Sequence, residues 1–590
     1  MYKKNSINYF NIILLSAFTI LISIIAFLDQ SIILGQQEEE VKQPPPIPVP
    51  TEPQVFKVLP TKSNDTTSTD LGTEPEHKDN WITANHDIFG TRNSNQTTIG
   101  KDNVKDLQVK WIFNSPFIIQ NPMLVVGDRG YAQDNGGRII AIDLNKGLNL
   151  WKLELGGNGQ NQHGITYDNG ILFAGTGKNA TLVAVNATDG KLIWQSIPVG
   201  DPNRNYRTQG PPTVWKDIVL IGQASSSGPP DLQGKIVAFN RTNGEKIWEF
   251  QTTVGPWVEG ENATRNGGAT TWTGGTLDPQ TGVYYVPTSN PSPRFNDTSR
   301  PGPNLWANSV LALDAQTGKL VWGKQLIPQD VHDWDVGWGN SLAKVKKANT
   351  SESSGEEKRV VITGTKRGDA YALDGQTGDI LWNKTVGIQY RTFADPAPNG
   401  SGVIWPGTHN GVEAYTANDN QTAYFAVTNM GFIFYSSGSA EKDAKVVPAF
   451  DAIENGLGNG TITAIDIDTG NIKWIYPTEF PTWVSPLVTN GIVIAGHVTA
   501  IGKPYGTSQF GGPDSPTSSP LIPSGIIFAL DKDTGKKLWQ FTIGTPPGIG
   551  GPSIGNGMLF VTTGQTFTIG SNSGGGIIAF GLPEQQQEVK

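Results

Sequence analysis

The sequence predicts an all-β protein, an eight-bladed β-propeller, on three observations. An Ala stands ten residues before a Trp seven times along the chain, in the pattern A-x-[D/N]-x-x-x-G-x-x-x-W. The motif is constant while the spacing between copies varies, which favours stacked units with connecting loops of different lengths. Finally, the two ends of the repeat region carry complementary halves of one further unit.

Each copy of the motif predicts one β-hairpin. The Asp or Asn and the Gly form a tight turn in which Gly supplies the positive φ, and alternating apolar residues on both sides form the strands. A hairpin that cannot bury its own apolar face must pack on its neighbours. The seven copies run from Ala141 to Trp151, Ala184 to Trp194, Ala238 to Trp248, Ala312 to Trp322, Ala372 to Trp382, Ala464 to Trp474 and Ala529 to Trp539.

An eighth unit is divided between the ends of the repeat region. Trp111, in LQVKWIF, has neither the Ala nor the turn ahead of it, whereas residues 575–582 reproduce the strand that leads into the motif and then stop. If the C-terminal strand joins the N-terminal strands in one blade, the ring closes without an open sheet edge. We therefore expect eight blades.

The segment ahead of the repeats predicts export. Lys3 and Lys4 precede a mostly apolar stretch from Tyr9 to Leu28, which is long enough to cross a bilayer. Residues 1–35 are therefore expected to be a signal peptide or a signal anchor. Residues 36–79, rich in Pro, Glu and Thr, are expected to be a disordered linker, and residues 80–585 the propeller.

Composition agrees with this organisation and excludes several functions. The chain contains 71 Gly and 40 Pro residues and only 16% charged residues, which suits a fold of many short strands and turns. A net charge of -9 provides no basic surface for nucleic acid, so that class of partner is excluded. Because the chain contains no Cys, it can neither form a disulfide nor attach a c-type haem covalently, and any electron acceptor must be a separate molecule.

The motif is the quinoprotein, or tryptophan-docking, repeat, and the chain resembles the pyrroloquinoline quinone (PQQ)-dependent alcohol dehydrogenases. The resemblance extends from Trp81 to Pro583, and residues 90–113 resemble the opening segment of that family. Similar repeats also build non-catalytic propellers such as an outer-membrane assembly scaffold, so the function depends on the residues of the site.

The loop PQDVHDWDVGWGN, residues 328–340, is the main candidate for the catalytic loop. In the family, a loop at this point carries H-D-x-W-D, whose last Asp is the general base and contacts the metal. HDWD is one residue shorter here, so Asp335 is the matching residue and Asp333 its near competitor. We expect a structural role for His332, because a lone His is a poor metal site.

Three further residues match the family's cofactor site. The resemblance places Trp272 as the floor beneath the cofactor and Asn290 as a metal ligand. A planar quinone suits a flat aromatic face, and a hard cation suits an amide oxygen. Lys366 falls where a cation hydrogen-bonds the quinone oxygens, and its charge would stabilise the negative charge that develops there.

Two candidates depart from the family pattern. The usual Glu metal ligand is missing, and Asp231 either replaces it out of register or caps a turn beside Pro230. Thr208 is expected to donate a hydrogen bond to the cofactor. The adjacent Cys pair that many family members place over the cofactor is absent.

The ligand set predicts a divalent cation such as Ca²⁺. Lanthanide-dependent members of the family carry an additional Asp two positions after the catalytic one, where this sequence has Gly337. Asn290, Asp335 and Asp231 would contribute one or two negative charges, which suits Ca²⁺ and its roughly 6–8 oxygen ligands.

Together these features predict an extracytoplasmic quinoprotein alcohol dehydrogenase, periplasmic or at the cell surface. It would transfer hydride from a small alcohol to PQQ and pass electrons to a separate cytochrome or blue copper protein, with the N-terminal segment as its membrane contact. Two alternatives stay open: a non-catalytic surface scaffold, and a related quinoprotein that acts on sugars or polyols.

Overall fold

The structure is a computed structural model of the chain. It describes residues 79–155, 163–224, 229–294, 297–336, 338–346, 357–389, 401–407, 409–435, 445–448, 458–499, 524–564 and 574–583. In these residues the regular structure is β-strand and short 3₁₀-helix, without α-helix. The described part holds no helix that is long and apolar enough to span a bilayer. The predicted signal or anchor and the predicted linker lie outside the described residues, apart from Asp79.

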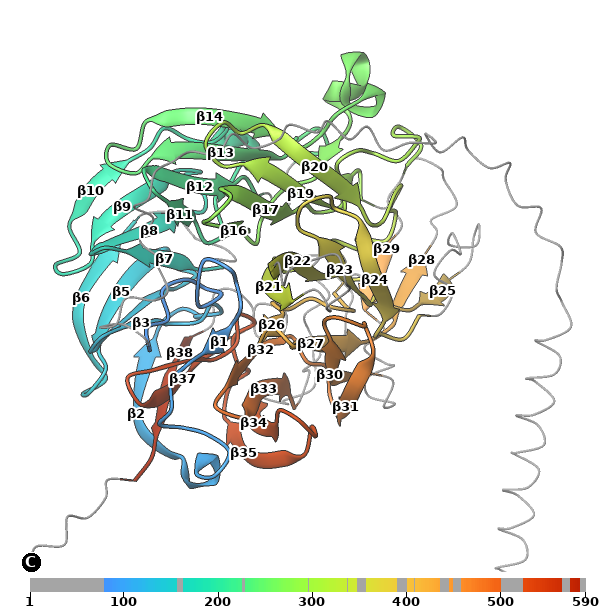
Figure 1. Cartoon of the computed structure of the whole chain (residues 1–590). Coiled ribbons are helices and arrows are strands. Elements are labelled where there is room, and N and C mark those ends of the chain that lie inside the picture. The colour runs from blue at the N-terminus through green and yellow to red at the C-terminus, as the bar shows by residue number, and fades with distance from the viewer. Residues whose placement is uncertain are drawn as a thin grey trace, which may run out of the picture. The chain divides into compact units, whose positions relative to one another are not determined.

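Eight four-stranded antiparallel blades are arranged in a ring (Figure 1), and in blade 7 the strand β1(Asn93–Ser94) adds a fifth, parallel strand to the sheet. The first four, numbered along the chain, are blade 1, β3(Leu124–Val126), β4(Arg129–Gln133), β5(Arg138–Asp143) and β6(Leu148–Glu154); blade 2, β7(Ile165–Asp168), β8(Ile171–Gly175), β9(Leu182–Asn186) and β10(Leu192–Gln195); blade 3, β11(Thr213–Trp215), β12(Ile218–Gly222), β13(Lys235–Asn240) and β14(Lys246–Gln251); and blade 4, β16(Thr276–Asp278), β17(Val283–Pro287), β19(Ser309–Asp314) and β20(Leu320–Gln325).

The remaining four complete the ring. They are blade 5, β21(Ser341–Lys346), β22(Glu357–Gly364), β23(Asp369–Asp374) and β24(Ile380–Thr385); blade 6, β26(Ala417–Asn418), β27(Thr422–Asn429), β30(Asn459–Asp466) and β31(Ile472–Thr478); blade 7, β32(Val484–Thr489), β33(Ile492–Val498), β34(Gly525–Asp531) and β35(Lys537–Ile543); and blade 8, β36(Ser553–Gly555), β37(Met558–Thr563), β38(Gly575–Gly581) and β2(Gln108–Ser115). The predicted eight-bladed propeller is confirmed.

Smaller elements lie outside the blades. A two-stranded ladder pairs β15(Gly267–Gly268) with β18(Pro291–Ser292), and a three-stranded sheet contains β25(Ser401–Ile404), β28(Phe432–Tyr435) and β29(Lys445–Pro448). The 3₁₀-helices are η1(Val104–Asp106), η2(Pro202–Arg204), η3(Pro256–Val258) and η4(Gly260–Thr264).

The motif has the same register in every blade. Its Ala, on the third strand, is the direct partner of its Trp on the fourth strand, as in Ala312↔Trp322 and Ala372↔Trp382. In blade 8 the partner of Trp111 is Ala579, which belongs to the C-terminal strand. The first and last parts of the repeat region therefore complete one sheet, as expected (Figure 1).

The motif Trp also docks on the next blade. In seven blades its indole N–H donates to a backbone carbonyl at the following blade's turn, over 2.7–3.1 Å. The pairs are Trp111 to Leu144, Trp151 to Ala187, Trp194 to Arg241, Trp248 to Ala315, Trp322 to Gly375, Trp382 to Ile467 and Trp474 to Lys532. Trp539 faces blade 8, which ends without the turn, and packs edge-on against Phe580.

An N-terminal segment connects the inner strands of the blades. We name residues 81–94, which include β1(Asn93–Ser94), the inner belt. Its backbone is hydrogen-bonded in turn to Val125 of blade 1, Tyr167 of blade 2, Leu277 of blade 4, Leu342 of blade 5, Asn418 of blade 6 and Val488 of blade 7. The fully buried Arg92 donates to the carbonyls of Ala84, Pro486 and Pro552.

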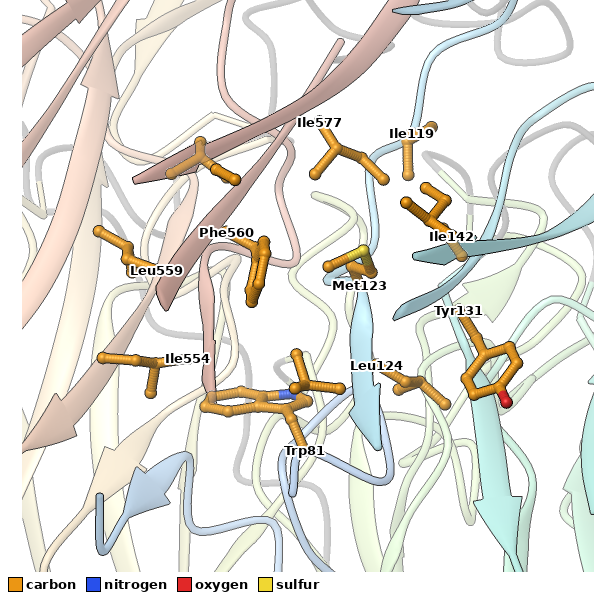
Figure 2. Close-up of a cluster of buried hydrophobic side chains, with 14 of the residues drawn as sticks. Trp81, Ile119, Met123, Leu124, Tyr131, Ile142, Ile554, Leu559, Phe560 and Ile577 are labelled. Atoms are coloured by element: carbon orange, nitrogen blue, oxygen red, sulfur yellow. The ribbon is translucent and has the colours of Figure 1, made fainter. Parts of the chain in front are cut away.

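The largest apolar cluster closes the ring on the side of blade 8. Trp81 of the inner belt contacts this cluster together with residues of blades 8 and 1, including Phe560, Ile577 and Leu124 (Figure 2). These side chains are fully buried, and burial of each large side chain contributes about 1.5–3 kcal/mol. The belt is therefore part of the core.

The docking geometry predicts that the turn Gly cannot accept a side chain. A methyl group at Gly378, where φ is +76°, would lie 2.6 Å from the indole of Trp322. A methyl group at Gly170, where φ is +80°, would have no atom within 4 Å, so Gly170→Ala is a matched control for the backbone cost alone. We expect Gly378→Ala to lower the free energy of unfolding of the protein by about 1–3 kcal/mol more than the control does, because the added methyl group overpacks the interface between two blades. Thermal unfolding of both variants would measure this difference, and equal losses would contradict it.

Candidate active site

The loop after β20 is organised by one buried carboxylate. Asp330 accepts from the backbone N–H groups of His332 and Trp334, both at 2.8 Å, and from the Asn308 side chain at 3.0 Å. This arrangement holds Asp333 in a left-handed conformation, with φ +65°. The loop thereby buries both Asp333 and Asp335, each 3% exposed.

Asp335 connects three segments of the chain. Its Oδ1 accepts from the Asn290 backbone N–H at 2.7 Å, and its Oδ2 lies 2.9 Å from Lys366 Nζ. Its backbone carbonyl also accepts from the Lys366 N–H at 2.9 Å. The structure thus brings together Asn290, Asp335 and Lys366 from blades 4 and 5 and the loop between them.

Trp272 lies beside this group. The Lys366 ammonium is 5.7 Å from the centroid of the Trp272 ring, within range of a cation–π contact. The indole of Trp338 packs edge-on against Trp272, with 5.0 Å between the centroids, and His163 packs against both rings. Trp272 itself remains partly exposed within this group of rings.

Three carboxylates surround the Lys366 ammonium. In addition to Asp335, Glu413 lies at 3.5 Å and Asp333 at 3.8 Å. Burial by itself would lower the pKa of Lys366, but the negative charges of Asp333, Asp335 and Glu413 outweigh it and raise the pKa above its ordinary value. Lys366 is therefore a permanent cation at the centre of the site.

Glu413 is a site residue that the sequence analysis missed. It lies on the segment before blade 6, where Val412 N–H bonds to the Thr365 carbonyl and Gly411 N–H to the Thr428 carbonyl. A methyl group at Gly411 would lie 2.3 Å from the Lys366 carbonyl, so only Gly permits this approach. No motif singled out Glu413, because the contact depends on two distant segments meeting.

The competitor, Asp333, lies at the edge of the cluster. Its Oδ2 is 3.4 Å from the Arg294 guanidinium, and burial raises the pKa of Asp333 to about 6 in spite of the nearby charges of Arg294 and Lys366. Asp335 accepts from the Asn290 backbone, and among the hydrogen bonds of the described residues none joins Asp333 to Asn290. The geometry therefore places Asp335 in closer contact than Asp333 with Asn290, the predicted metal ligand, and with Lys366, the predicted cation.

Two predicted site residues are engaged elsewhere. The Thr208 hydroxyl donates its proton to the Thr181 carbonyl at 2.8 Å in this structure, so its donation to a cofactor stays a prediction that would require this bond to be exchanged. Asp231 forms an ion pair with Arg204 at 2.7 Å. Among the described contacts, none joins Asp231 to Asn290 or Asp335, and the structure does not bring it into the ligand set.

His332 and Gly337 complete the predicted loop. His332 stacks on Trp334 with 4.1 Å between the ring centroids, in keeping with the predicted structural role. Gly337, on which the comparison with lanthanide-dependent enzymes rested, lies outside the described residues.

The donor set fits a quinone and a hard cation in part. Trp272 offers a partly exposed aromatic ring, and no described residue donates a hydrogen bond to Asn290 Oδ1. That amide oxygen and the adjacent Asp335 carboxylate are suitable ligands for a hard cation. The described residues do not form a cluster of three acidic or His side chains around one metal position, so a complete cage is not present.

The chain matches a known family model over residues 81–386, described as "Glucose/ethanol/alcohol dehydrogenase, beta-propeller domain", which is about half of the sequence. This chain belongs to the PQQ-dependent dehydrogenase β-propeller family. A second model, for the outer membrane protein assembly factor BamB, matches residues 307–511 and reflects the shared repeats.

Individual relatives are similar along most of their length. A protein of Paracoccus denitrificans with the name "Putative dehydrogenase XoxF" is 28% identical, with 85% of this chain and 88% of the relative covered. The lanthanide-dependent methanol dehydrogenase of Methylorubrum extorquens is 26% identical, with coverages of 84% and 87%. A solved europium-containing methanol dehydrogenase shares the fold, with a TM-score of 0.68, 22% identity and coverages of 87% and 99%.

The neutral state of His163 predicts a pH dependence of stability. Burial lowers the pKa of His163 to about 3, so below the unfolded pKa the unfolded chain binds a proton that the folded chain excludes. For each unit by which the pH falls between roughly 6 and 3, the buried neutral His163 should lower the free energy of unfolding by about 1.4 kcal/mol. His163→Gln loses packing at pH 7, but its stability deficit should narrow as the pH falls. Thermal unfolding of both proteins at pH 7, 5 and 4 measures this, and a constant deficit would contradict it.

Proposed function

We propose that this protein is an exported PQQ-dependent alcohol dehydrogenase that oxidises an alcohol to an aldehyde or ketone. The observation that carries the proposal is the convergence of Asn290, Asp335 and Lys366 beside the partly exposed ring of Trp272. Family membership and relatives named as methanol and alcohol dehydrogenases support it.

Each residue has a definite role in this proposal. PQQ would supply the two-electron acceptor for hydride. Trp272 provides the flat surface beneath it, and Lys366 holds positive charge where negative charge develops. Asp335 accepts the hydroxyl proton of the alcohol, with its orientation fixed by Asn290 and Lys366. Burial excludes water from this proton transfer.

Asn290 and Asp335 would hold the metal ion. We propose a divalent cation of the Ca²⁺ type, because one neutral amide and one carboxylate contribute a single negative charge. One relative is named a lanthanide-dependent methanol dehydrogenase, and two further carboxylates, Asp333 and Glu413, lie near the site, so a lanthanide ion is the alternative. The metal that restores activity is therefore a direct test of the proposed divalent site.

We further propose a location outside the cytoplasm and a separate electron acceptor. Residues 1–35 would direct export as a signal peptide or anchor, and residues 36–79 would link it to the propeller at residues 80–585. A relative named methanol dehydrogenase [cytochrome c] subunit 1 from Paracoccus denitrificans, 25% identical, supports a cytochrome as acceptor. A blue copper protein is the alternative.

The alternative function is a non-catalytic scaffold, and the match to the family model of an assembly factor supports this alternative. Metal-dependent uptake of PQQ by the purified protein, followed by absorbance, separates the two functions. An enzyme takes up the cofactor and reduces it when an alcohol is added, whereas a scaffold does neither. A substrate panel that includes sugars and polyols would then define the substrate class.

Asp335→Asn should abolish turnover while the propeller remains folded, because the amide keeps the shape and one oxygen but cannot accept the proton. We expect at least a 10²-fold loss of kcat with an artificial electron acceptor. Asp333→Asn is the matched control and should retain most activity. Full activity of Asp335→Asn would overturn the assignment, and loss in Asp333→Asn alone would transfer the role of base to Asp333.

Metal-stripped protein reconstituted with PQQ and Ca²⁺ should regain activity without a lanthanide. The comparison is kcat after reconstitution with Ca²⁺ or with La³⁺ at equal PQQ occupancy. Activity with La³⁺ alone would contradict the divalent site and imply that Asp333 or Glu413 supplies additional charge.

A further inference from the structure

One half-buried arginine lacks a partner for part of its charged group. The guanidinium Nη1 of Arg207 is buried and has no hydrogen-bond partner among the described residues. In the described part of the chain it is the one arginine or lysine nitrogen of which this is true. The Arg207 side chain donates one hydrogen bond to a described residue, from Nε to Asn205 Oδ1, at 2.7 Å.

Other buried arginines of this protein have partners. Arg241 and Arg359 each form an ion pair with a carboxylate, and Arg92 and Arg300 donate to backbone carbonyls. An unsatisfied buried donor costs free energy, most of all on a charged group. Burial accordingly lowers the pKa of Arg207. The described residues do not offset the cost of burying this nitrogen.

The segment that carries Arg207 borders the candidate site. Three residues after Arg207, a methyl group at Gly210 would lie 3.2 Å from the Trp272 carbonyl. The Gln209 carbonyl accepts from the His163 N–H at 2.9 Å, and the His163 ring packs against that of Trp272, with 5.1 Å between the centroids. Arg207 therefore enters the neighbourhood of Trp272 from the connection between blades 2 and 3.

Local bonds hold the arginine in place. Arg207 and Ala224 exchange two backbone hydrogen bonds, of 3.0 and 2.8 Å, just beyond the end of β12. Asn205, which receives the Nε–H, has a left-handed conformation with φ +67° at the end of η2, and its own N–H donates to the Pro202 carbonyl at 3.0 Å. The backbone and Nε are thus fixed, which leaves the Nη1 end of the guanidinium for a ligand.

Two other basic side chains near Trp272 are unsuited to bind a carboxylate. The Lys366 ammonium, 5.7 Å from the centroid of the Trp272 ring, already faces three carboxylates. Burial lowers the pKa of His163 to about 3, so its ring is neutral. PQQ carries carboxylate groups on its ring system and needs positive charge beyond that of Lys366. Arg207 offers a positive charge that no described carboxylate uses.

We propose that Arg207 binds a carboxylate of PQQ through its unpartnered Nη1. The inference rests on the proposed function, which places PQQ beside Trp272. A planar guanidinium matches a carboxylate in geometry, and hydrogen bonds between two charged groups are stronger than those between neutral ones. The contact satisfies the buried nitrogen and offsets negative charge of the cofactor. Arg207 contributes to cofactor affinity and takes no part in the transfer of hydride or protons.

The test measures the dissociation constant of PQQ by quenching of tryptophan fluorescence, with the full-length protein saturated with Ca²⁺ and, in parallel, with La³⁺. Arg207→Met removes the guanidinium and should weaken PQQ binding by about 10- to 100-fold, the loss expected for a hydrogen bond to a charged group. Arg207→Lys keeps the charge without the planar fork and should bind with an affinity between those of Arg207→Met and the wild type.

Lys178→Met is the matched control. Lys178 is exposed and follows Gly177, whose N–H donates to the Thr208 carbonyl, so the variant removes one positive charge from the same region without a buried contact. Its affinity for PQQ should stay within about twofold of the wild type, because exposed charges are screened. An equal loss in Lys178→Met and Arg207→Met would reveal a general effect of charge and overturn the proposal.

Thermal unfolding separates ligand binding from a structural role. Without PQQ, Arg207→Met should unfold at the wild-type temperature or above it, because the variant removes an unsatisfied buried donor. PQQ at one fixed concentration should raise the Tm of the variant less than that of the wild type. An apo variant that unfolds well below the wild type, or one that binds PQQ as tightly, would overturn the proposal. Failure of the wild type itself to bind PQQ would refute the proposed function, and the ligand assigned to Arg207 with it.

Discussion

The docking of each motif Trp on the next blade is the interaction on which the structure depends. A single blade buries only part of its apolar surface, and the shared indole-to-carbonyl bond fixes the angle between neighbours. Because the same geometry repeats, eight blades close a ring whose inner strands converge on one axis. Residues far apart in sequence, such as Asn290 and Lys366, meet there as a result.

The candidate site concentrates more negative charge than a folded interior usually tolerates. Three buried carboxylates surround one ammonium, and buried charge is costly unless it is compensated. This excess of negative charge favours a site that binds a further cation, and it explains why Lys366 is held in its charged form. The propeller can support such a site because docking and the inner belt stabilise the ring independently of it.

The sequence was sufficient for the fold, and it named several of the residues that meet in the candidate site. Seven copies of one motif predicted the blades, and the divided eighth unit predicted the pairing of Trp111 with Ala579. Glu413 and His163 were missed because neither lies in a motif, and only the fold brings them to Lys366 and Trp272. The bond from the Thr208 hydroxyl to the Thr181 carbonyl is likewise a contact that no local pattern reveals.

In the shortened candidate loop, contacts distinguish two residues between which the spacing left the choice open. With one residue fewer than the family pattern, Asp333 and Asp335 were both possible matches for the base. Asp330 anchors the loop at two backbone N–H groups, which buries both residues beside Lys366. Of the two, Asp335 is the one that bonds to Lys366 through both its backbone and its side chain while also accepting from Asn290. Its orientation is therefore fixed from two sides, the condition that a general base requires.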